Sequence, residues 1–255
     1  MTSPPKLTAT IVAMNEADRI GPCLASVAFC DEVIVVDSHS TDDTRELAAA
    51  AGAIVIERDW PGFGPQKDHA AEAASHDWIL QLDADERVTP ELRAEIEALR
   101  DQHFAGHVGW TMPRCSNWFG RWIRHGSWYP DRQLRLYDRR AGHWEGAEPH
   151  PKVNAKGQVG SLGGDLQHEP YRNLSEHLKI IDKYTTVMAE GLVARGKRVG
   201  LTKVLVNPVY RWFRFVFLQR GFLDGWRGWA LAGIEAHYVQ MKYLKAYLLQ
   251  RRDQG

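Results

Sequence analysis

The segment Trp78 to Glu86, read as WILQLDADE, joins an apolar run directly to a cluster of carboxylates. A short apolar run bounded by polar residues is typical of a buried strand, and acidic residues that follow it lie at its carboxyl end. Two carboxylates one residue apart can both face a divalent ion, and hard oxygen ligands suit Mg²⁺ or Mn²⁺. The segment therefore predicts a strand over 78–82 and a metal site at Asp83 and Asp85.

Strand-like and helical patterns alternate in the residues before and after this segment. Helical patterns cover 42–51 and a stretch that begins at Pro90 with Thr89 as its cap. Such alternation indicates crossover connections and a mostly parallel sheet, so the expected fold class is α/β. The other predicted strands are Leu7 to Met14, Val33 to Val36 and Ile54 to Glu57.

Polar residues follow two further predicted strands at the point where each ends. Asn15 and Glu16 follow the first strand, and Asp37 and Ser38 follow the second. Because open parallel sheets bind ligands beyond the carboxyl ends of their strands, these side chains are candidates for binding a base and ribose. Any one of them can instead form a turn or cap a helix, but three polar strand ends together favour a nucleotide site.

Residues 60–67, WPGFGPQK, predict a glycine-bearing loop that leads into a helix. Backbone amides at a helix start, with Gln66 and the Lys67 ammonium group, suit a phosphate. A departing nucleotide diphosphate gains negative charge, which a bound metal ion stabilises. The first hundred residues thus predict a metal-assisted site for a nucleotide diphosphate.

Composition limits the class of protein and its compartment. The chain has 255 residues, a formal net charge of zero and 44% hydrophobic residues, which argues for one domain with an addition and against general nucleic-acid binding. Three cysteines form no disulfide framework, and no secretory signal or run of about 18 apolar residues is present. These features predict a cytoplasmic protein.

The last 55 residues differ from the rest in charge. Residues 201–255 hold nine Lys or Arg against three Asp or Glu, so the remaining residues hold 23 against 29. From Tyr210 onward, aromatic residues alternate with arginines, which is typical of a helix that lies in a membrane interface. We expect 201–255 to be an amphipathic helical membrane-association segment; packing on the catalytic domain or a homodimer contact are the alternatives.

The middle of the chain has less regular patterns. Residues 110–144 contain five tryptophans and predict a long insertion that frames a pocket, with a strand at 134–137. Residues 153–162 predict a hairpin around Gly157, and apolar residues from Leu174 to Met188 recur at helical spacing. That helix is expected to end near Gly191 or Gly196.

The sequence resembles the family 2 glycosyltransferases of the GT-A fold, and within them the bacterial lipopolysaccharide core glucosyltransferases of the WaaE and KdtX type. Besides Asn15 and Glu16, the resemblance rests on VVDSHSTDDT at 35–44, GFGPQK at 62–67, WILQLDADE at 78–86, IRHGSWYPDRQLRL at 123–136 and GFLDG at 221–225.

The resemblance implies a GT-A (Rossmann-like) domain over 1–200, flanked by helices, and a nucleotide-sugar donor. It implies a divalent cation at Asp85 with Asp83 nearby, donor binding by Asp83 and Ala84, Asp37 at the base or ribose, and inversion at the anomeric carbon. UDP-glucose as donor and a lipopolysaccharide inner-core acceptor are inherited from the same resemblance. His39 and Asp68 depart from the glycine and asparagine common at these positions.

An inverting transfer needs one general base on the side opposite the leaving group. Asp131 is the first candidate, followed by Glu148 and Glu145; alternatively, Asp131 forms an ion pair with Arg132 or Arg135.

Two further groups complete the predicted site. His150 is a candidate metal ligand, since some members of this fold use an imidazole there. Trp128 and Tyr129 offer flat faces to a sugar ring, and Arg124 and His125 lie close to them in sequence, so these four are the candidate acceptor-binding residues.

Two other functions agree less well with the sequence than glycosyl transfer does. A sugar nucleotidyltransferase needs a basic, glycine-rich loop after its first strand, where this chain has Asn15, Glu16 and Asp18. A non-catalytic, membrane-bound module of the same fold would not need Asp83, Asp85 and Asp131.

Overall fold

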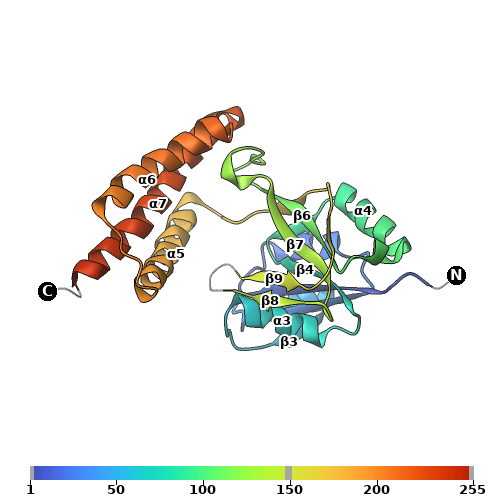
Figure 1. The fold of residues 1–255 in the computed structure, drawn as a ribbon. Coiled ribbons are helices and arrows are strands. Elements are labelled where there is room, and N and C mark those ends of the chain that lie inside the picture. Colours follow the sequence, from blue (N-terminus) through green and yellow to red (C-terminus); the bar gives the residue numbers. More distant parts are fainter. Residues whose placement is uncertain (1–2, 147–150, 253–255) are drawn as a thin grey trace. The chain divides into compact units, whose positions relative to one another are not determined.

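The computed structural model describes residues 3–146 and 151–252, which form two compact units (Figure 1). The first, the sheet unit, comprises 3–115 with 131–146 and 151–168, and the second, the helical unit, comprises 116–130 with 169–252. The functional division predicted between residues 200 and 201 stays a prediction.

A mixed, mostly parallel sheet forms the centre of the sheet unit. Within the described residues it has nine strands in the order β3-β2-β1-β4-β7-β6-β11-β5, with β10 beside β6. Strands β1 to β4 run parallel, whereas β7 is antiparallel to both β4 and β6. This confirms the expected α/β class. The strands are β1 (Leu7–Ala13), β2 (Glu32–Asp37), β3 (Ile54–Glu57), β4 (Trp78–Asp83), β5 (Glu86–Val88), β6 (Gly109–Ser116), β7 (Asp131–Asp138), β10 (Val159–Ser161) and β11 (Leu166–His168).

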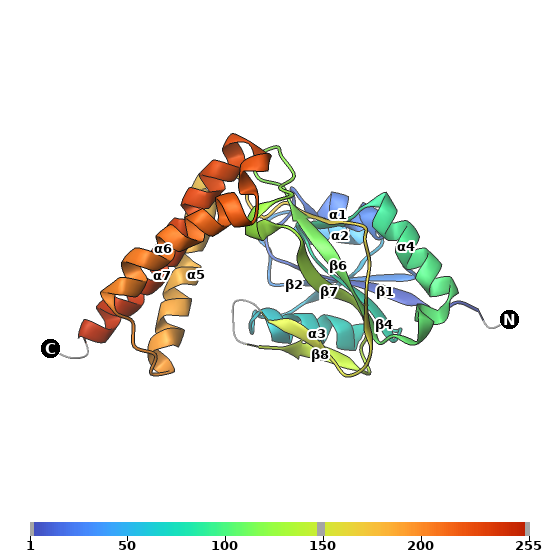
Figure 2. The same cartoon turned by 45° about the horizontal axis from the view of Figure 1, so that its top comes forward.

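Helices cover both faces of this sheet because its central strands are apolar on both sides. One core contains Leu7, Ala9 and Ile11 of β1, and the other contains Ile34 and Ile79. Helices α1, α2 and α4 lie on the first face, and α3 with the β8–β9 hairpin lies on the second (Figure 2). Their bounds are α1 (Ile20–Ser26), α2 (Thr44–Ala50), α3 (Phe63–Ala73), α4 (Pro90–Asp101), the 3₁₀ turn η1 (His103–Gly106), β8 (Gly142–Glu145) and β9 (Lys152–Ala155).

The start of α4 is as the sequence predicts. The Thr89 hydroxyl accepts a hydrogen bond from the backbone N–H of Leu92 at 3.2 Å, and Pro90 occupies the first helical position. Proline is favoured there because its missing N–H would have no partner inside the helix.

The hairpin predicted over 153–162 is wrong. Strand β9 pairs with β8, whereas β10 pairs with β6 in the large sheet. A Cβ on Gly157 would lie 2.8 Å from the Val108 side chain, and Gly157 has a φ of +151°. The glycine therefore lets the chain pass close to the start of β6. Residues 110–144, expected to be an insertion, contain β7 and most of β6 and β8, while residues 116–130, between β6 and β7, belong to the helical unit.

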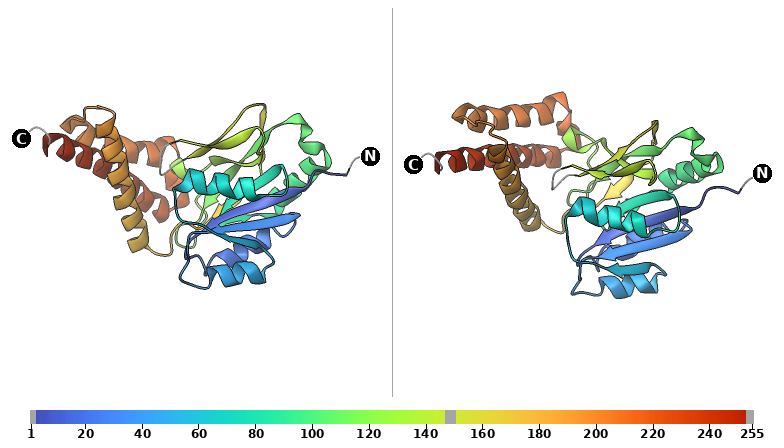
Figure 3. Two further views of the ribbon diagram at one scale, coloured as in Figure 1. Left: turned by 90° about the horizontal axis from the view of Figure 1, so that it is seen from below. Right: turned by 60° about the horizontal axis from the view of Figure 1, so that its bottom comes forward.

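Three long helices make up most of the helical unit (Figure 3). Helices α5 (Leu174–Ala194) and α6 (Leu201–Phe213) both pack against α7 (Trp226–Arg252). Gly196, at φ +66°, follows the end of α5 as expected. Short turns fill the connections: η2 (Gly126–Trp128), the π-helical turn η3 (Arg214–Leu218) and η4 (Gly221–Asp224).

Residues from the 116–130 segment form part of the core of this helical unit. Trp118 and Ile123 pack with Phe215 and Leu231, and all four are at least 96% buried. The start of α7 passes so close to η4 that a Cβ on Gly228 would lie 1.8 Å from the Gly221 carbonyl oxygen. In the part of the chain that the structure describes, no helix is long and apolar enough to cross a membrane.

Candidate active site

The carboxyl ends of β1, β2 and β4 meet at one edge of the sheet. The parallel register places Ala13 beside Asp37 and Val12 beside Asp83. The polar residues predicted at these three strand ends therefore lie close together, as open parallel sheets require of a ligand site.

Asp83 is held by two cations. Its Oδ1 lies 2.6 Å from the Lys67 ammonium nitrogen, and its Oδ2 accepts a hydrogen bond from Arg135 at 2.7 Å. Burial alone would raise the pKa of Asp83, but Lys67 and Arg135 hold it well below the usual value. Both carboxylate oxygens, predicted to bind metal, thus already have positive partners.

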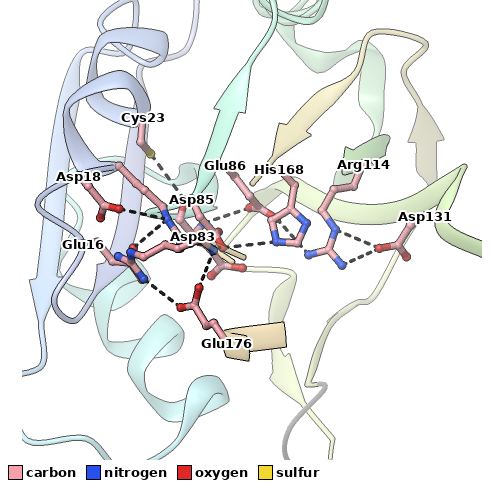
Figure 4. A network of polar contacts seen from close by, with 12 residues as sticks. Glu16, Asp18, Cys23, Asp83, Asp85, Glu86, Arg114, Asp131, His168 and Glu176 are labelled. Atoms are coloured by element: carbon pink, nitrogen blue, oxygen red, sulfur yellow. Dashed lines mark hydrogen bonds and ion pairs between the residues drawn. The ribbon is translucent and has the colours of Figure 1, made fainter. Parts of the chain in front are cut away.

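The contacts of Arg135 extend into a chain of alternating charges, of which Figure 4 labels Asp83, Glu86, Arg114 and Asp131. Arg135 also donates to Glu86 Oε1 at 2.7 Å, Arg114 lies 3.2 Å from the same oxygen, and Arg114 reaches Asp131 Oδ2 at 2.6 Å. We call this set the charge ladder. Its six members, in order, are Lys67, Asp83, Arg135, Glu86, Arg114 and Asp131.

Strand pairing explains why the ladder forms. The antiparallel register of β6 and β7 places Arg114 directly opposite Asp131, where opposite charges stabilise a pair of strands. Glu86 is fully buried and also accepts the Asp83 backbone N–H at 3.0 Å. A buried carboxylate needs such partners, because an uncompensated charge is costly in a protein interior.

The candidate general base, Asp131, belongs to this ladder. Its Oδ1 accepts a hydrogen bond from Gln133 at 2.8 Å, and its side chain is 37% exposed. The alternative expectation, that Asp131 forms an ion pair, is confirmed, but the partner is Arg114. The predicted partners are wrong, since Arg132 donates to the Leu162 carbonyl and Arg135 to Asp83 and Glu86. The role of Asp131 as base stays a prediction.

Glu148 and Glu145 are the other two candidates for the general base. Glu148 lies outside the described residues. Glu145 is exposed on β8 and accepts hydrogen bonds from Asn154 and His143.

Asp85 faces an imidazole that the sequence reasoning missed. Its Oδ2 lies 3.5 Å from His168 Nε2 and 3.5 Å from an Arg19 guanidinium nitrogen. Burial would raise the pKa of Asp85, but His168 and Arg19 outweigh that effect and lower it. His168 reaches this place because β11 pairs antiparallel with β5, with His168 opposite Glu86. His150, the imidazole predicted for the metal, lies outside the described residues.

A divalent ion fits the donor set at Asp85. Within residues 3–146 and 151–252, no group of three or more acidic, Cys or His side chains is arranged to enclose a metal. A carboxylate nevertheless suits Mg²⁺ or Mn²⁺ that takes its other ligands from substrate phosphates and water, and an imidazole ligand suits a transition metal such as Mn²⁺ better than Mg²⁺. Asp85 supplies the carboxylate and His168 the imidazole.

The strand-end loops are bound to each other. Asn15 adopts a φ of +56°, and its side-chain oxygen accepts the Thr41 backbone N–H at 2.8 Å. Asp37 is fully buried, and its two oxygens accept the backbone N–H and the hydroxyl of Ser40. The Glu16 N–H donates to Thr44 at 2.8 Å. These contacts shape the loops; donor binding by Asn15, Glu16 and Asp37 stays a prediction.

The predicted glycine loop is partly wrong, since α3 begins at Phe63 and includes Gln66 and Lys67. Pro65 is tolerated because it falls in the first helical turn, where its missing N–H breaks no hydrogen bond. The buried Gln66 amide donates to the Ser38 hydroxyl at 3.1 Å, and its oxygen has no hydrogen-bond partner. An unsatisfied buried amide oxygen next to Ser38 is a group that a bound donor can satisfy.

The candidate acceptor residues belong to the helical unit, and each has a contact there. The Arg124 and His125 backbone N–H groups point at the buried Asp224 carboxylate, with His125 donating at 2.9 Å. Trp128 donates to Glu235 at 2.8 Å, and Arg124 lies over the Tyr129 ring. Their acceptor role stays a prediction.

A mostly parallel sheet with an Asp-Ala-Asp turn after β4, polar ends on β1 and β2, and an antiparallel β7 defines the GT-A class of nucleotide-sugar enzymes. Solved structures support this fold. The mannosyltransferase PcManGT of Pyrobaculum calidifontis, in complex with GDP-Man and Mn²⁺, matches 96% of this chain and 88% of its own with a TM-score of 0.56 at 13% identity. Glucosyl-3-phosphoglycerate synthase of Mycobacterium tuberculosis, with Mn²⁺ and UDP, matches 77% and 83% with a TM-score of 0.50 at 18% identity.

The chain belongs to glycosyltransferase family 2. The model of that family, "Glycosyl transferase family 2", matches residues 8–153. The lipopolysaccharide core biosynthesis glycosyltransferase LpsC of Rhizobium meliloti is 30% identical over 251 residues, which is 94% of this chain and 92% of LpsC. The predicted family, fold and enzyme class are therefore confirmed.

Proposed function

We propose that this enzyme transfers a hexose, with inversion, from UDP-glucose to an inner-core saccharide of lipopolysaccharide or to another lipid-linked glycan at the cytoplasmic face of a membrane, with Mg²⁺ or Mn²⁺ bound. The observation that carries the proposal is the facing pair of Asp85 and His168 at the end of β4. The similarity to LpsC over nearly the whole chain supports the acceptor class.

Asp85 and His168 are the residues that would hold the cation. When bound, the ion stabilises negative charge on the departing nucleotide diphosphate. Lys67 and Arg135 hold the Asp83 carboxylate in place at the same strand end, so that it needs no rearrangement when the donor binds.

Asp131 would act as the general base. It would take the proton of the acceptor hydroxyl as the new bond to the anomeric carbon forms and the bond to the diphosphate breaks. Arg114 orients one oxygen of Asp131, and Gln133 orients the other. Replacing Asp131 with Asn should preserve donor binding and abolish turnover; a variant that still turns over would remove Asp131 from this role.

The first experiment screens nucleotide sugars for protection against heat, with and without Mn²⁺. A bound donor raises the melting temperature by mass action, so UDP-glucose with Mn²⁺ should raise it and EDTA should reverse the shift. The same donor is then assayed for transfer to a deacylated lipopolysaccharide core.

The matched variants are Asp85→Asn and Asp101→Asn, the second at an exposed position at the end of α4. Only Asp85→Asn should lose the metal-dependent shift and reduce transfer, by about a hundredfold or more. Transfer that continues unchanged in EDTA, or in Asp85→Asn, would contradict the proposed metal dependence.

A further inference from the structure

Helix α6 carries an apolar face that the helical unit leaves exposed. Its two buried residues, Val204 and Pro208, lie on the other side of the helix. Six large apolar residues of α6 are 45–67% exposed: Leu201, Leu205, Val206, Val209, Tyr210 and Phe213.

Helical geometry places these six residues on one side. At about 100° per residue they fall within about half of the helical wheel, and Val204 and Pro208 fall within the opposite half. Lys203 and Arg214, both exposed, fall just past the Tyr210 edge of the apolar half. A helix with this distribution buries one side in its own fold and offers a second, separate apolar side with cations along its border.

Aromatic contacts continue this face beyond α6. The Phe213 ring lies 5.2 Å from Phe217 of η3, and Phe217 lies 6.2 Å from Trp229 of α7. Phe217 and Trp229 are 46% and 45% exposed. We call this surface, α6 with Phe217 and Trp229, the apolar face.

The segment that carries the apolar face presents no exposed carboxylate. Its only acidic residues between 201 and 252 are Asp224 and Glu235. Asp224 is 97% buried, and Glu235 forms an ion pair with Arg211 at 2.6 Å. The described surface of this segment is therefore apolar and cationic, which is complementary to an apolar layer bordered by negative charge.

From this geometry we propose that the apolar face docks onto the surface of a phospholipid bilayer that contains anionic headgroups. The aromatic and aliphatic side chains enter the acyl boundary, while Lys203 and Arg214 meet lipid phosphates. A second copy of the chain fits less well, because a symmetric contact would bring the same cations together. The proposal rests on the proposed function, in which the acceptor is lipid-linked.

The exposed residues of the apolar face differ from the basic, aromatic stretch that the sequence predicts to contact the membrane. Phe215, an aromatic residue of the basic C-terminal stretch, is fully buried, and Arg211 is engaged by Glu235. Leu205 and Val209, which lie before that stretch, are instead among the most exposed apolar residues of the chain.

The test is flotation of the full chain with vesicles of phosphatidylcholine alone or mixed in equal parts with phosphatidylglycerol. The wild type should float with the mixed vesicles, and less so at high salt, which screens the cationic border. The triple variant Leu205→Gln, Val209→Gln and Phe213→Gln should weaken binding on the order of a hundredfold, because three buried apolar side chains are lost. These positions are exposed, so the fold should be preserved, as circular dichroism can check.

A matched control replaces exposed apolar residues elsewhere in the same unit: Leu178→Gln, Val187→Gln and Leu248→Gln. The control should float like the wild type. Charge reversal with Lys203→Glu and Arg214→Glu should reduce binding to mixed vesicles, whereas Lys179→Glu and Lys183→Glu on α5 should reduce it less.

The proposal is overturned if the triple variant floats as well as the wild type, or if the wild type does not bind mixed vesicles. It is also overturned if sedimentation shows a wild-type dimer that the triple variant abolishes, while neither protein binds vesicles. Transfer to a water-soluble, deacylated acceptor is measured in parallel. Lost flotation with retained transfer supports the docking surface. Absent transfer in every variant and in the wild type refutes the proposed function instead, without affecting the flotation result.

Discussion

Replacing Glu86 with Gln is the sharpest test of the charge ladder, because Glu86 lies between two guanidinium groups. Its Oε1 accepts from Arg135 at 2.7 Å and from Arg114 at 3.2 Å, and its Oε2 accepts the Asp83 N–H at 3.0 Å. A glutamine has one acceptor oxygen, so in either orientation its NH₂ group meets a buried donor.

The magnitude follows from these contacts. A buried donor without an acceptor costs about 1–3 kcal/mol, and removing one partner of a buried ion pair costs about 3–5 kcal/mol. Because Arg135 keeps Asp83 and Arg114 keeps Asp131, the loss should fall at the lower end, at about 3 kcal/mol of unfolding free energy.

The assay is amide hydrogen exchange of peptides from β4 and β7, which reports on the sheet unit alone. A loss of about 3 kcal/mol lowers protection there roughly a hundredfold. The control is Glu97→Gln, which breaks an exposed pair with Arg93 on α4 and should change stability by less than about 0.5 kcal/mol. Protection of Glu86→Gln within about tenfold of the wild type would refute the view that the ladder stabilises this unit.

Three further predictions concern single residues. His168→Gln should weaken Mn²⁺ binding in the presence of UDP by at least about tenfold, measured as free Mn²⁺ by electron paramagnetic resonance; unchanged binding would exclude the imidazole as a ligand. Because the folded pKa of Asp83 lies below its unfolded value, Asp83 adds stability above about pH 4 that is lost as the pH falls through the folded pKa. Lys67→Met should raise the folded pKa of Asp83, so acid unfolding of the variant should begin at a higher pH than that of the wild type. Circular dichroism measures this, and coincident unfolding curves would contradict the prediction. Gly228→Ala should destabilise the helical unit by more than about 2 kcal/mol in urea, since its Cβ meets a backbone carbonyl, while Gly233→Ala on the same helix, with open space around it, should be neutral or slightly stabilising.

The local parts of the fold could be predicted from the sequence because their signals are local. The strand at 54–57 has the predicted bounds, and those at 78–83 and 32–37 differ from the prediction by one residue at one or both ends. Thr89 caps α4 because its side chain needs only a partner three residues away. Asp83 and Asp85 follow the apolar run that places them at a strand end.

The features that were not predicted from the sequence depend on pairing between segments that are distant in the chain. Arg114 meets Asp131 only because β6 and β7 pair in one register, which no short pattern in either strand specifies. His168 lies in a strand of three residues, too short for alternation to identify, and it reaches Asp85 through the pairing of β11 with β5. Strand β9 (Lys152–Ala155) precedes a hairpin signal at Gly157, but its partner is β8.

The helical unit is assembled from two stretches of chain that are made at different times. Arg227 donates to the Phe119 carbonyl, 108 residues earlier in the sequence. At a synthesis rate of about 5–20 residues per second, Trp118 and Ile123 emerge on the order of ten seconds before the helices that cover them. During that interval the nascent chain exposes an aromatic segment that is prone to non-specific association. Shortening the gene at its 3′ end would leave that segment permanently uncovered.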